Sequence, residues 1–494
     1  MRMLRGVIVG IAVTTSISGC TQQRTGIVSV ADAMGAANLN SIEYSGSGEL
    51  FGFGQAYIPA ERWPRFIQRS YNVAINYQTP AMRMNTVRSQ GEYPPRGGAA
   101  QPVGADQRTI QVVSGKYAWT EGGAQPNPNP NAVGDRLRQL WTTPHGVVKA
   151  AMANGGKLEG NVIKFKVDDR EVKATLNDQN LVQKVSFLGT NEVVGDFADE
   201  ITYSDYADFN GIKFPAHIVE TQAGFPILDV RINEVKPNVA VTLNVPENVA
   251  QAQAPPAKPA VNVQKLADGV LYLTAAGISS WAVEFKDYVV AVEGPNGEAR
   301  SLAVNEEIQK RIPNKPIKYV INTHAHYDHA GGLRTYVAQG ITVITHERNK
   351  PFFETVWAKP RTVAPDMLAQ NPKPATFETV QEKKVIADGT RTMELYHLQN
   401  SGHNVATLIV YLPKEGLLYY GDGYNPPPGD NPIDPARTPE YGIDLYRNVT
   451  LLNLNVKTIA PAHSTRAVPY DNLKKAVGLL PVESHPPAAQ LSGK

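Results

Sequence analysis

The chain has 494 residues, a formal net charge of +2 and 19% charged residues. This length is about twice what one hydrophobic core usually organises, so we expect two globular domains. The near-neutral charge and the lack of a basic run exclude a large field for nucleic acid or acidic lipid, so no nucleic-acid partner is expected.

The first twenty residues are typical of an export signal. Residues 1–5 contain two arginines, and residues 6–17 form an apolar run that is too short to cross a bilayer comfortably. Residues 17–20 (ISGC) resemble the lipobox of bacterial lipoproteins, in which the cysteine becomes the lipidated first residue. Cys20 is the only cysteine of the chain. The alternative is an ordinary signal peptide that contains a cysteine.

The lipobox resemblance implies a location and a mode of attachment. Membrane attachment would occur through a lipidated Cys20, on the periplasmic side of the cell envelope. Thr21 follows the cysteine in place of an aspartate. By the same resemblance, this favours an outer-membrane lipoprotein.

Residues 21–245 are predicted to form an antiparallel, β-rich domain. Val172–Leu176 and Leu181–Leu188, separated by turn-forming residues, indicate one hairpin. Phe214–Glu220 and Pro226–Val235 indicate another, which turns near Ala223 and Gly224.

The best helix candidate of this first domain is Arg136–Met152, although Pro144 interrupts it. A sheet partly closed around a helix is similar to the half-barrel domains of lipoprotein carriers and related envelope lipoproteins. Tyr203–Pro215 is also like strands of such domains. The resemblance implies that the domain binds an apolar ligand, docks a partner or spaces the rest of the chain from the membrane. His145 and His217 are isolated, and we interpret both as structural.

A linker and a change of pattern follow. Residues 246–262 are rich in Ala, Pro and Gln and lack hydrophobic periodicity, which predicts an extended linker. Beyond it, Glu298–Ile312 is predicted to be a helix and Ile317–Asn322 a buried strand. We therefore expect an α/β domain at residues 263–480 and a flexible tail at residues 481–494.

A cluster of histidines follows the buried strand directly. His324, His326, Asp328 and His329 form an HxHxDH pattern within Thr323–Gly332. Because alternate positions of an extended chain point the same way, His324 and His326 can converge on one ion. The chain then turns toward a helix, so Asp328 and His329 can face a second ion. Neutral imidazoles and carboxylates are ligands that suit Zn²⁺.

Three later residues complete a ligand set. His403 lies in SGHN, Asp422 in YYGDG and His463 in PAHS. Each lies just beyond an apolar run or within a few residues of one. Loops at the ends of sheet strands place ligands in this way.

The order and spacing of these motifs resemble the metallo-β-lactamase superfamily, from Val263 to about Leu480. The resemblance implies a C-terminal α/β four-layer αββα sandwich, preceded here by the antiparallel half-barrel-like domain. It implies two Zn²⁺ per chain, one on His324, His326 and His403 and the other on Asp328, His329 and His463. Asp422 and a hydroxide would bridge them. The iron-binding relatives usually carry glutamate in place of His326, which makes iron the weaker alternative.

Two features depart from the best-known members of this superfamily. Asp422 stands where many β-lactamases carry a cysteine ligand, which resembles glyoxalase II and the lactonases. Glu293 stands where many members carry an aspartate that supports the site, and its side chain is one methylene longer, so its role is left open. His346 and His397 are interpreted as structural.

The resemblance implies a hydrolase acting on a small-molecule substrate. The bridging hydroxide would attack an ester, lactone, amide or related bond. Asp328 would orient this hydroxide and carry its proton to the leaving group. Tyr424 and Tyr327 are candidate donors to the oxyanion.

The substrate and two alternative functions stay open. Two long segments, Lys350–Thr376 and Tyr424–Tyr441, are expected to form the mouth of the site. Their aromatic side chains would meet a moderately apolar substrate or, as the alternative, pack onto their own domain, and Arg361 or Arg437 could meet a carboxylate. The alternatives to a general hydrolase are a true β-lactamase and a non-catalytic envelope binding lipoprotein.

Overall fold

The computed structural model describes residues 26–427, 429, 431, 433 and 440–479. The predicted signal segment with Cys20, residue Arg437 and the tail from residue 481 lie outside these residues. Within the described part of the chain, no helix combines the length and the apolar character that a membrane span requires.

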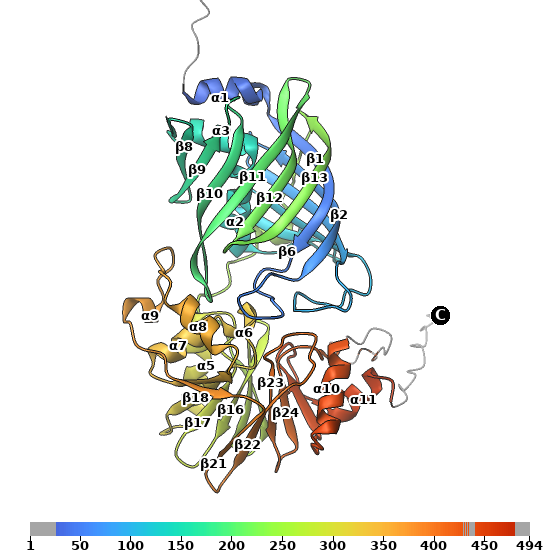
Figure 1. Ribbon diagram of the computed structural model, residues 1–494, viewed down its shortest axis with the longest axis vertical. Helices are drawn as coiled ribbons and strands as arrows, with labels where there is room; N and C mark the ends of the chain where they lie inside the picture. Colours follow the sequence, from blue (N-terminus) through green and yellow to red (C-terminus); the bar gives the residue numbers. More distant parts are fainter. Residues whose placement is uncertain (1–25, 428, 430, 432, 434–439, 480–494) are drawn as a thin grey trace, which may run out of the picture.

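The first domain is built on one sheet of thirteen strands that pair antiparallel and curve around two helices (Figure 1). Its strands are β1 (Ser41–Phe51), β2 (Arg65–Asn76), β3 (Ala81–Gln90), β4 (Gln107–Ser114), β5 (Tyr117–Glu121), β6 (Asn127–Pro128), β7 (Lys157–Glu159), β8 (Val162–Val167), β9 (Arg170–Leu176), β10 (Val182–Asn191), β11 (Gly195–Phe209), β12 (Ile212–Gln222) and β13 (Phe225–Pro237). Its α-helices are α1 (Ile27–Met34), α2 (Val133–Trp141) and α3 (Pro144–Ala153). The prediction of an antiparallel β-rich domain is confirmed.

Both predicted hairpins are present, as β9–β10 and β12–β13. The second hairpin turns through Ala223 and Gly224, whose φ angles are 53° and 90°. Two central residues with positive φ form the tight turn that matches the twist of antiparallel strands, and glycine adopts this conformation at little cost.

The predicted helix at Arg136–Met152 is two helices, α2 and α3. Pro144 is the first residue of α3, where its missing N–H costs nothing, and the Thr143 side chain caps the helix by accepting from the Gly146 N–H at 3.2 Å. The His145 imidazole is buried in this core and bonds the Met34 carbonyl at 3.1 Å. Burial lowers the pKa of His145 to about 4, so this histidine is a neutral structural group.

The concave face of the sheet is filled at one end and hollow at the other. At the end that α1 covers, apolar residues of α1, α3 and the strands form a continuous core. Toward the second domain, a cavity of about 860 Å³ lies between α2 and the sheet. Phe53, Phe197, Asp199 and Glu220 are among its lining residues.

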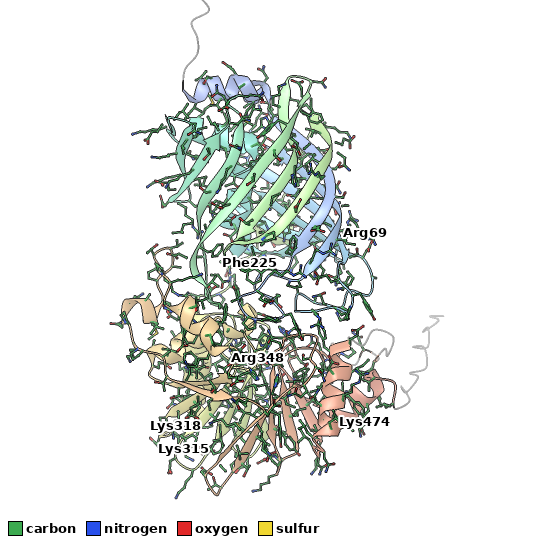
Figure 2. All side chains as sticks on the ribbon, in the orientation of Figure 1. Arg69, Phe225, Lys315, Lys318, Arg348 and Lys474 are labelled. Carbon is green, nitrogen blue, oxygen red and sulfur yellow. The ribbon has the colours of Figure 1, made fainter. Side chains whose placement is uncertain are left out.

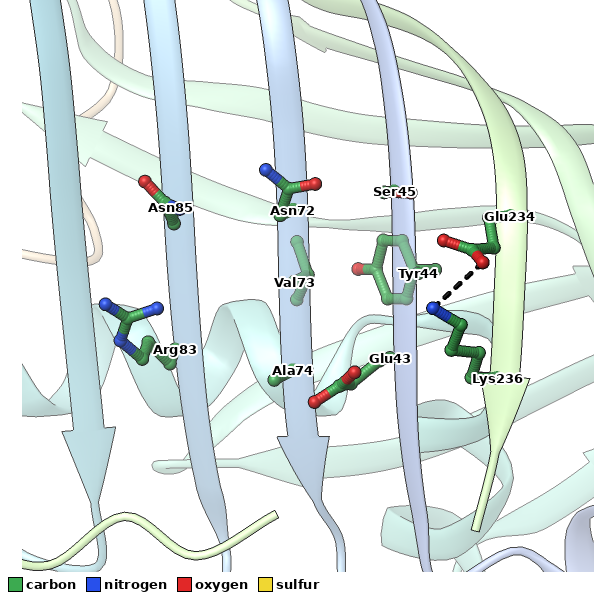
Figure 3. A pocket seen from close by; sticks show the side chains of 10 residues that line it. All are labelled: Glu43, Tyr44, Ser45, Asn72, Val73, Ala74, Arg83, Asn85, Glu234 and Lys236. Carbon is green, nitrogen blue, oxygen red and sulfur yellow. Dashed lines mark ion pairs between the residues drawn. The ribbon is translucent and has the colours of Figure 1, made fainter. Parts of the chain in front are cut away.

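A shallower depression of about 260 Å³ lies on the sheet where β3, β2, β1 and β13 run side by side (Figure 3). Most of its polar side chains alternate with core residues along the strands, so they point to the outer face. Glu234 and Lys236 form an ion pair of 2.8 Å there, and Arg83 pairs with Glu121 at 2.9 Å. Because these charges are already paired, the depression is ordinary solvated surface.

The second domain contains two sheets. The seven-stranded sheet consists of β14 (Asn262–Ala267), β15 (Val270–Ala275), β16 (Ile278–Glu284), β17 (Val289–Val292), β18 (Ile317–Ile321), β19 (Thr342–His346) and β20 (Phe377–Val380). The six-stranded sheet consists of β21 (Lys383–Ala387), β22 (Thr392–His397), β23 (Leu408–Leu412), β24 (Leu417–Tyr420), β25 (Thr458–Pro461) and β26 (Val468–Pro469). The remaining helices are α4 (Glu247–Ala250), α5 (Glu298–Arg311), α6 (Tyr327–Ala330), α7 (Leu333–Ala338), α8 (Lys350–Trp357), α9 (Met367–Gln370), α10 (Glu440–Leu451) and α11 (Tyr470–Ala476).

Each of these two sheets buries both faces. Residues of both sheets form one apolar cluster, in which the Trp281 and Tyr419 rings lie 5.3 Å apart edge to face. The other face of the seven-stranded sheet packs on α5, α7 and α8, and that of the six-stranded sheet on α10 and α11. The central strands β17, β23 and β24 therefore read as continuous apolar runs that are buried throughout.

Two segments differ from the prediction. Lys350–Thr376 is not a long loop at the mouth of a site, because it contains α8 and α9 and buries Phe352 and Phe353 in the core. The predicted linker is not extended throughout, because its first residues form α4 and bury Val249 against the first domain. In α8 the aromatic side chains pack inward from one face of the helix. In the linker, Val249 packs against the first domain and holds α4 there.

Arg361 was one of two arginines that could meet a substrate carboxylate, and for Arg361 the structure contradicts this prediction. Its guanidinium donates to the carbonyl oxygens of Asn191, Glu192 and Val193 in the first domain, at 3.2, 2.7 and 2.9 Å. It therefore connects the two domains. Phe225, visible at the lower end of the first domain in Figure 2, packs edge to face on Trp63 at the same interface.

The carboxyl groups in the cavity of the first domain generate a prediction about stability. Burial and the neighbouring Asp199 carboxylate raise the pKa of Glu220 from 4.5 to about 8. The folded state thus keeps a proton on Glu220 that the unfolded state releases at lower pH. The free energy of unfolding therefore falls as the pH rises from 4.5 to about 8. Glu220→Gln should raise the melting temperature at about pH 9 and change it little at about pH 5.

Thermal unfolding followed by circular dichroism measures this effect as the difference between variant and wild type. Glu171→Gln, an exposed glutamate of β9, serves as the matched control. An equal shift at both pH values for Glu220→Gln would contradict the proton held at this position.

Candidate metal centre

Adjacent strand ends place the predicted ligands at one edge of the second domain. β24 and β25 run parallel, with Tyr420 paired to Pro461. Asp422 and His463 each lie two residues beyond this pair, so they emerge side by side. The HxHxDH segment begins three residues after β18 ends and turns into the short helix α6, as predicted.

The first group of converging side chains consists of His324, His326, His403 and Asp422, whose ligand atoms lie within 4.8 Å of one another. The Nε2 atoms of His324 and His403 are 3.2 Å apart. His403 Nε2 also lies 3.0 Å from Asp422 Oδ2. All four side chains are buried.

The second group consists of Asp328, His329, Asp422 and His463, again within 4.8 Å. His329 Nε2 lies 3.0 Å from both Asp422 Oδ1 and His463 Nε2. Asp422 therefore faces the first group with one oxygen and the second with the other. This arrangement matches the bridging position that the sequence resemblance implies for Asp422.

The chemistry of the donor atoms fits a metal ion. Nδ1 of His326 is buried and makes no hydrogen bond within the described residues, while its Nε2 lies 2.9 Å from the Ala56 carbonyl. A carbonyl only accepts, so Nε2 carries the proton and Nδ1 presents a lone pair to the cluster. A metal-bound histidine has this tautomeric arrangement. The site could thus hold a cation at each group.

Glu293 supports the site directly. Its Oε2 lies 3.0 Å from His329 Nδ1, and its Oε1 accepts from the Thr323 N–H at 2.7 Å. The carboxylate therefore fixes the proton on Nδ1 of His329 and leaves Nε2 free to bind. Glu293 is fully buried and has a φ angle of 73°, so the backbone adopts a strained conformation to place it.

The pKa values follow from burial and from the two carboxylates. Burial, together with neighbouring imidazoles, lowers the pKa of His324 well below its usual range and that of His326 to about 3. The Asp422 carboxylate, acting against burial, raises the pKa of His463 to about 9. Burial alone would raise the pKa of Asp422, but His329, His463 and His403 hold it well below its usual range. Burial thus favours the neutral form of His324 and His326, whereas the carboxylate of the second group favours positive charge on His463.

Exposure shows from which side the cluster can be reached. The side chains of Asp328 and His463 are 31% and 28% exposed, whereas those of His324 and His403 are 0% and 5% exposed. The second group is therefore open on the side of Asp328 and His463. The first group is enclosed by protein.

The first domain covers His326 on the enclosed side and also contacts Asp328 on the open side, which the sequence did not indicate. Gln55 Nε2 donates to Asp328 Oδ1 at 2.8 Å, and the Ala56 carbonyl accepts from His326 and, at 3.1 Å, from Asn404 Nδ2. Gly97 of the first domain also reaches this side, because its N–H donates to the Gly402 carbonyl at 3.0 Å. No local pattern marks Gln55 or Ala56.

The two candidate oxyanion donors lie in packed surroundings. The ring of Tyr327 contacts Phe53 and Trp63 of the first domain, at 5.3 and 5.7 Å between ring centres, so it forms part of the domain interface. Tyr424 is buried in the cluster beneath α10 and α11, and its hydroxyl has no hydrogen-bond partner within the described residues. Neither hydroxyl forms a hydrogen bond to the clustered ligands.

The second domain is similar to a known protein family. Residues 285–463 match the family model described as metallo-beta-lactamase superfamily. None of the curated proteins compared with the chain matches it.

The solved structures that are similar to part of the chain include two metallo-beta-lactamases. A metallo-beta-lactamase from Pontibacter korlensis is 19% identical, with a TM-score of 0.33, over 44% of this chain and 98% of that one. The metallo-beta-lactamase FIM-1 from Pseudomonas aeruginosa, in its mono-zinc form, is 16% identical, with a TM-score of 0.34, over 46% of this chain and 97% of that one.

Both the family model and the structure identify the family of the second domain, whose two sheets carry the candidate ligands at one edge. The matched residues include every histidine and aspartate of both groups, from His324 to His463. The C-terminal part of this chain is therefore a domain of the metallo-beta-lactamase superfamily.

Proposed function

We propose that this protein is a hydrolase that uses two zinc ions to cleave an ester, lactone, amide or related bond of a small molecule. The observation that carries the proposal is the pair of ligand groups that share Asp422. Three imidazoles and a carboxylate in one group, and two imidazoles and two carboxylates in the other, suit Zn²⁺. Iron is the weaker alternative because His326 occupies the position where iron-binding relatives usually carry glutamate.

The chain supplies the proton-handling group. When bound, the two ions act as Lewis acids and lower the pKa of a water to near neutrality. Asp328 holds one oxygen against Gln55 and turns the other toward His463, at 3.4 Å. The Asp328 carboxylate can therefore orient a water on the open side of the site, accept its proton and pass it to the leaving group.

The enclosed side of the site restricts the approach of a substrate. Because the first domain covers His326 and His403, a substrate reaches the centre past Asp328 and His463. The cover also excludes water from the first group, which strengthens electrostatic interactions there. We therefore propose a small-molecule substrate that enters from one side.

The fold of the second domain supports a finer proposal. We propose that residues 263–479 form the four-layer αββα sandwich expected from the sequence. The support is one apolar cluster between the two sheets and one cluster between each sheet and its helices.

Metal removal and a ligand substitution test the proposed hydrolase. Purified protein from residue 21 onward should bind about two zinc ions and hydrolyse members of an ester, lactone and amide panel, and chelation should abolish turnover. His326→Ala should lower turnover by at least about 100-fold, because it removes one ligand of the first group. Metal content by mass spectrometry and turnover by absorbance measure these effects.

His217→Ala provides the matched control for this prediction. His217 lies in β12 of the first domain and bonds Asp229 at 2.8 Å, away from both ligand groups. Full activity of His326→Ala, or zinc binding at neither group in the wild type, would overturn the proposal.

The same assay separates the two alternative functions. A chromogenic cephalosporin belongs in the panel because a true β-lactamase would turn it over rapidly in a zinc-dependent way. Asp422, in place of a cysteine ligand, argues against that outcome. Zinc binding without turnover of the whole panel would favour a non-catalytic binding lipoprotein.

The role of Tyr424 stays a prediction from the sequence, and a pair of substitutions tests it. Tyr424 and Tyr420 both carry a buried hydroxyl without a hydrogen-bond partner in the described structure. If Tyr424 donates to the oxyanion, Tyr424→Phe should lower kcat by about 10-fold or more at similar KM, whereas Tyr420→Phe should not. Steady-state kinetics on the best substrate decides, and equal kcat for both variants would remove Tyr424 from the reaction.

We also propose that the protein is a lipoprotein on the periplasmic side of the envelope, attached through Cys20 and held in the outer membrane. The support is the sequence ISGC after a short apolar run, in a chain with one cysteine. Lipid chains give stable attachment that a soluble domain lacks.

Cys20→Ser should therefore move the protein from the membrane fraction to the soluble fraction. Immunoblotting of fractionated cells measures the distribution, with Ser18→Ala as a control that keeps the cysteine. Continued membrane fractionation of Cys20→Ser would contradict the lipid anchor.

A further inference from the structure

The first domain contacts a ligand of each metal group through two consecutive residues, Gln55 and Ala56. We propose that this dipeptide completes the metal centre: Gln55 positions Asp328, Ala56 positions His326, and the centre reaches full zinc affinity only when the first domain is docked. The inference rests on the proposed zinc site. It adds a positioning residue and a coupling between domains that the ligand motifs do not contain.

The orientation of the Gln55 amide is fixed by its two partners. The Ala99 N–H donates to Oε1 at 3.0 Å, so the NH₂ group must face Asp328 Oδ1, 2.8 Å away. One carboxylate oxygen of Asp328 is thereby held in place. The other oxygen faces His329 and His463, at 3.6 and 3.4 Å.

The Ala56 carbonyl acts on the first group in a parallel way. It accepts the Nε2 proton of His326, which turns the unpartnered Nδ1 lone pair toward the cluster. Asn404, the neighbour of the ligand His403, donates to the same carbonyl. A single backbone oxygen of the first domain therefore contacts a ligand and the residue next to another ligand.

The backbone on both sides of the dipeptide is fastened to the same motifs. The Tyr327 N–H donates to the Gly54 carbonyl at 3.1 Å, and the Val405 N–H to the Tyr57 carbonyl at 3.0 Å. Tyr327 separates two ligands in the HxHxDH motif, so its contact with Phe53 and Trp63 also packs the first domain against the metal motif.

The fit leaves no room at two glycines. A Cβ atom on Gly54 would lie 2.5 Å from the Tyr327 ring, and one on Gly98 would lie 2.9 Å from His326 Cε1. Gly98 contacts Gln55 as well, because its Cβ atom would overlap Oε1 of that side chain. This close approach of the two backbones is what brings Gln55 and Ala56 within hydrogen-bond distance of the ligands.

The coupling has a thermodynamic consequence. If docking of the first domain improves zinc binding, zinc must stabilise the docked position by the same factor. The segment of residues 52–64 should therefore be better protected in the zinc-bound protein than in the metal-free protein.

Substitutions at Gln55 distinguish hydrogen bonding from packing. Gln55→Glu keeps the shape and the acceptor for Ala99 but sets a carboxylate against Asp328, whereas Gln55→Met keeps the approximate volume and loses both hydrogen bonds. A positioning role predicts weaker zinc binding at the second group, by about 10-fold for Met and by more for Glu. A packing role predicts the opposite order. Gln179→Glu and Gln179→Met, in an exposed turn, are the matched controls.

Zinc affinity is measured by competition with a chromophoric chelator, and the visible spectrum of the cobalt-substituted protein reports the geometry of each site. The altered spectrum should be confined to one of two cobalt ions. If either variant fails to fold, Gly98→Ala gives a second test of the contact between the first domain and both groups, because its added methyl group would overlap the Gln55 side chain and crowd His326. Wild-type zinc affinity and cobalt spectrum in the Gln55 variants and in Gly98→Ala would overturn the inference.

Hydrogen exchange of residues 52–64 provides a readout that requires no substrate. Zinc should slow exchange in the wild-type full chain, and Gln55→Glu should reduce that difference. Equal exchange with and without zinc in the wild type would also overturn the inference. If the wild type binds no zinc, the proposed function itself has failed, whereas two bound zinc ions with unchanged Gln55 variants would refute the positioning role alone.

Discussion

Five imidazoles and two carboxylates converge at one edge of the second domain, and the surrounding structure is arranged to make this possible. Lone pairs that face each other at about 3 Å repel unless a cation or a proton lies between them. Burial increases the free-energy cost of this repulsion. The tautomer of a histidine in the cluster is therefore set by a hydrogen bond to its ring nitrogen that faces away from the cluster. Glu293 does this for His329, and the Ala56 carbonyl does it for His326. The strained backbone of Glu293 is one local cost of the arrangement.

The features that the sequence predicts well are those encoded locally. The hairpins follow from strand patterns and turn residues, and the break at Pro144 follows from its missing N–H. The HxHxDH segment predicted a turn into a helix after a buried strand, which α6 confirms. Glu293 could be noticed in sequence, but its support of His329 required the positions of two residues 36 apart.

The features that the sequence did not predict depend on contacts between distant segments. Gln55 and Asp328 are 273 residues apart, and no periodicity links them. For the aromatic residues of α8, substrate contact and packing onto their own domain both stayed open, and Arg361 was a candidate to meet a carboxylate, because the sequence alone cannot tell an exposed side chain from a buried one. In the structure, the aromatic residues of α8 lie in a core and Arg361 lies between the two domains. A sequence pattern identifies the candidate ligands. The groups that hydrogen-bond to them are brought into place only by the tertiary fold.

The parallel pairing of β24 with β25 has a consequence for how the chain can vary. Asp422 and His463 are placed relative to each other by the register of β24 and β25, because each lies two residues beyond the pair Tyr420–Pro461. The part of the chain between Asp422 and α10 can therefore gain or lose residues without changing this register. By contrast, one residue added between Tyr420 and Asp422 would displace a group shared by both sites. The fold thus separates the part of the chain that is free to diversify from the part whose length is fixed.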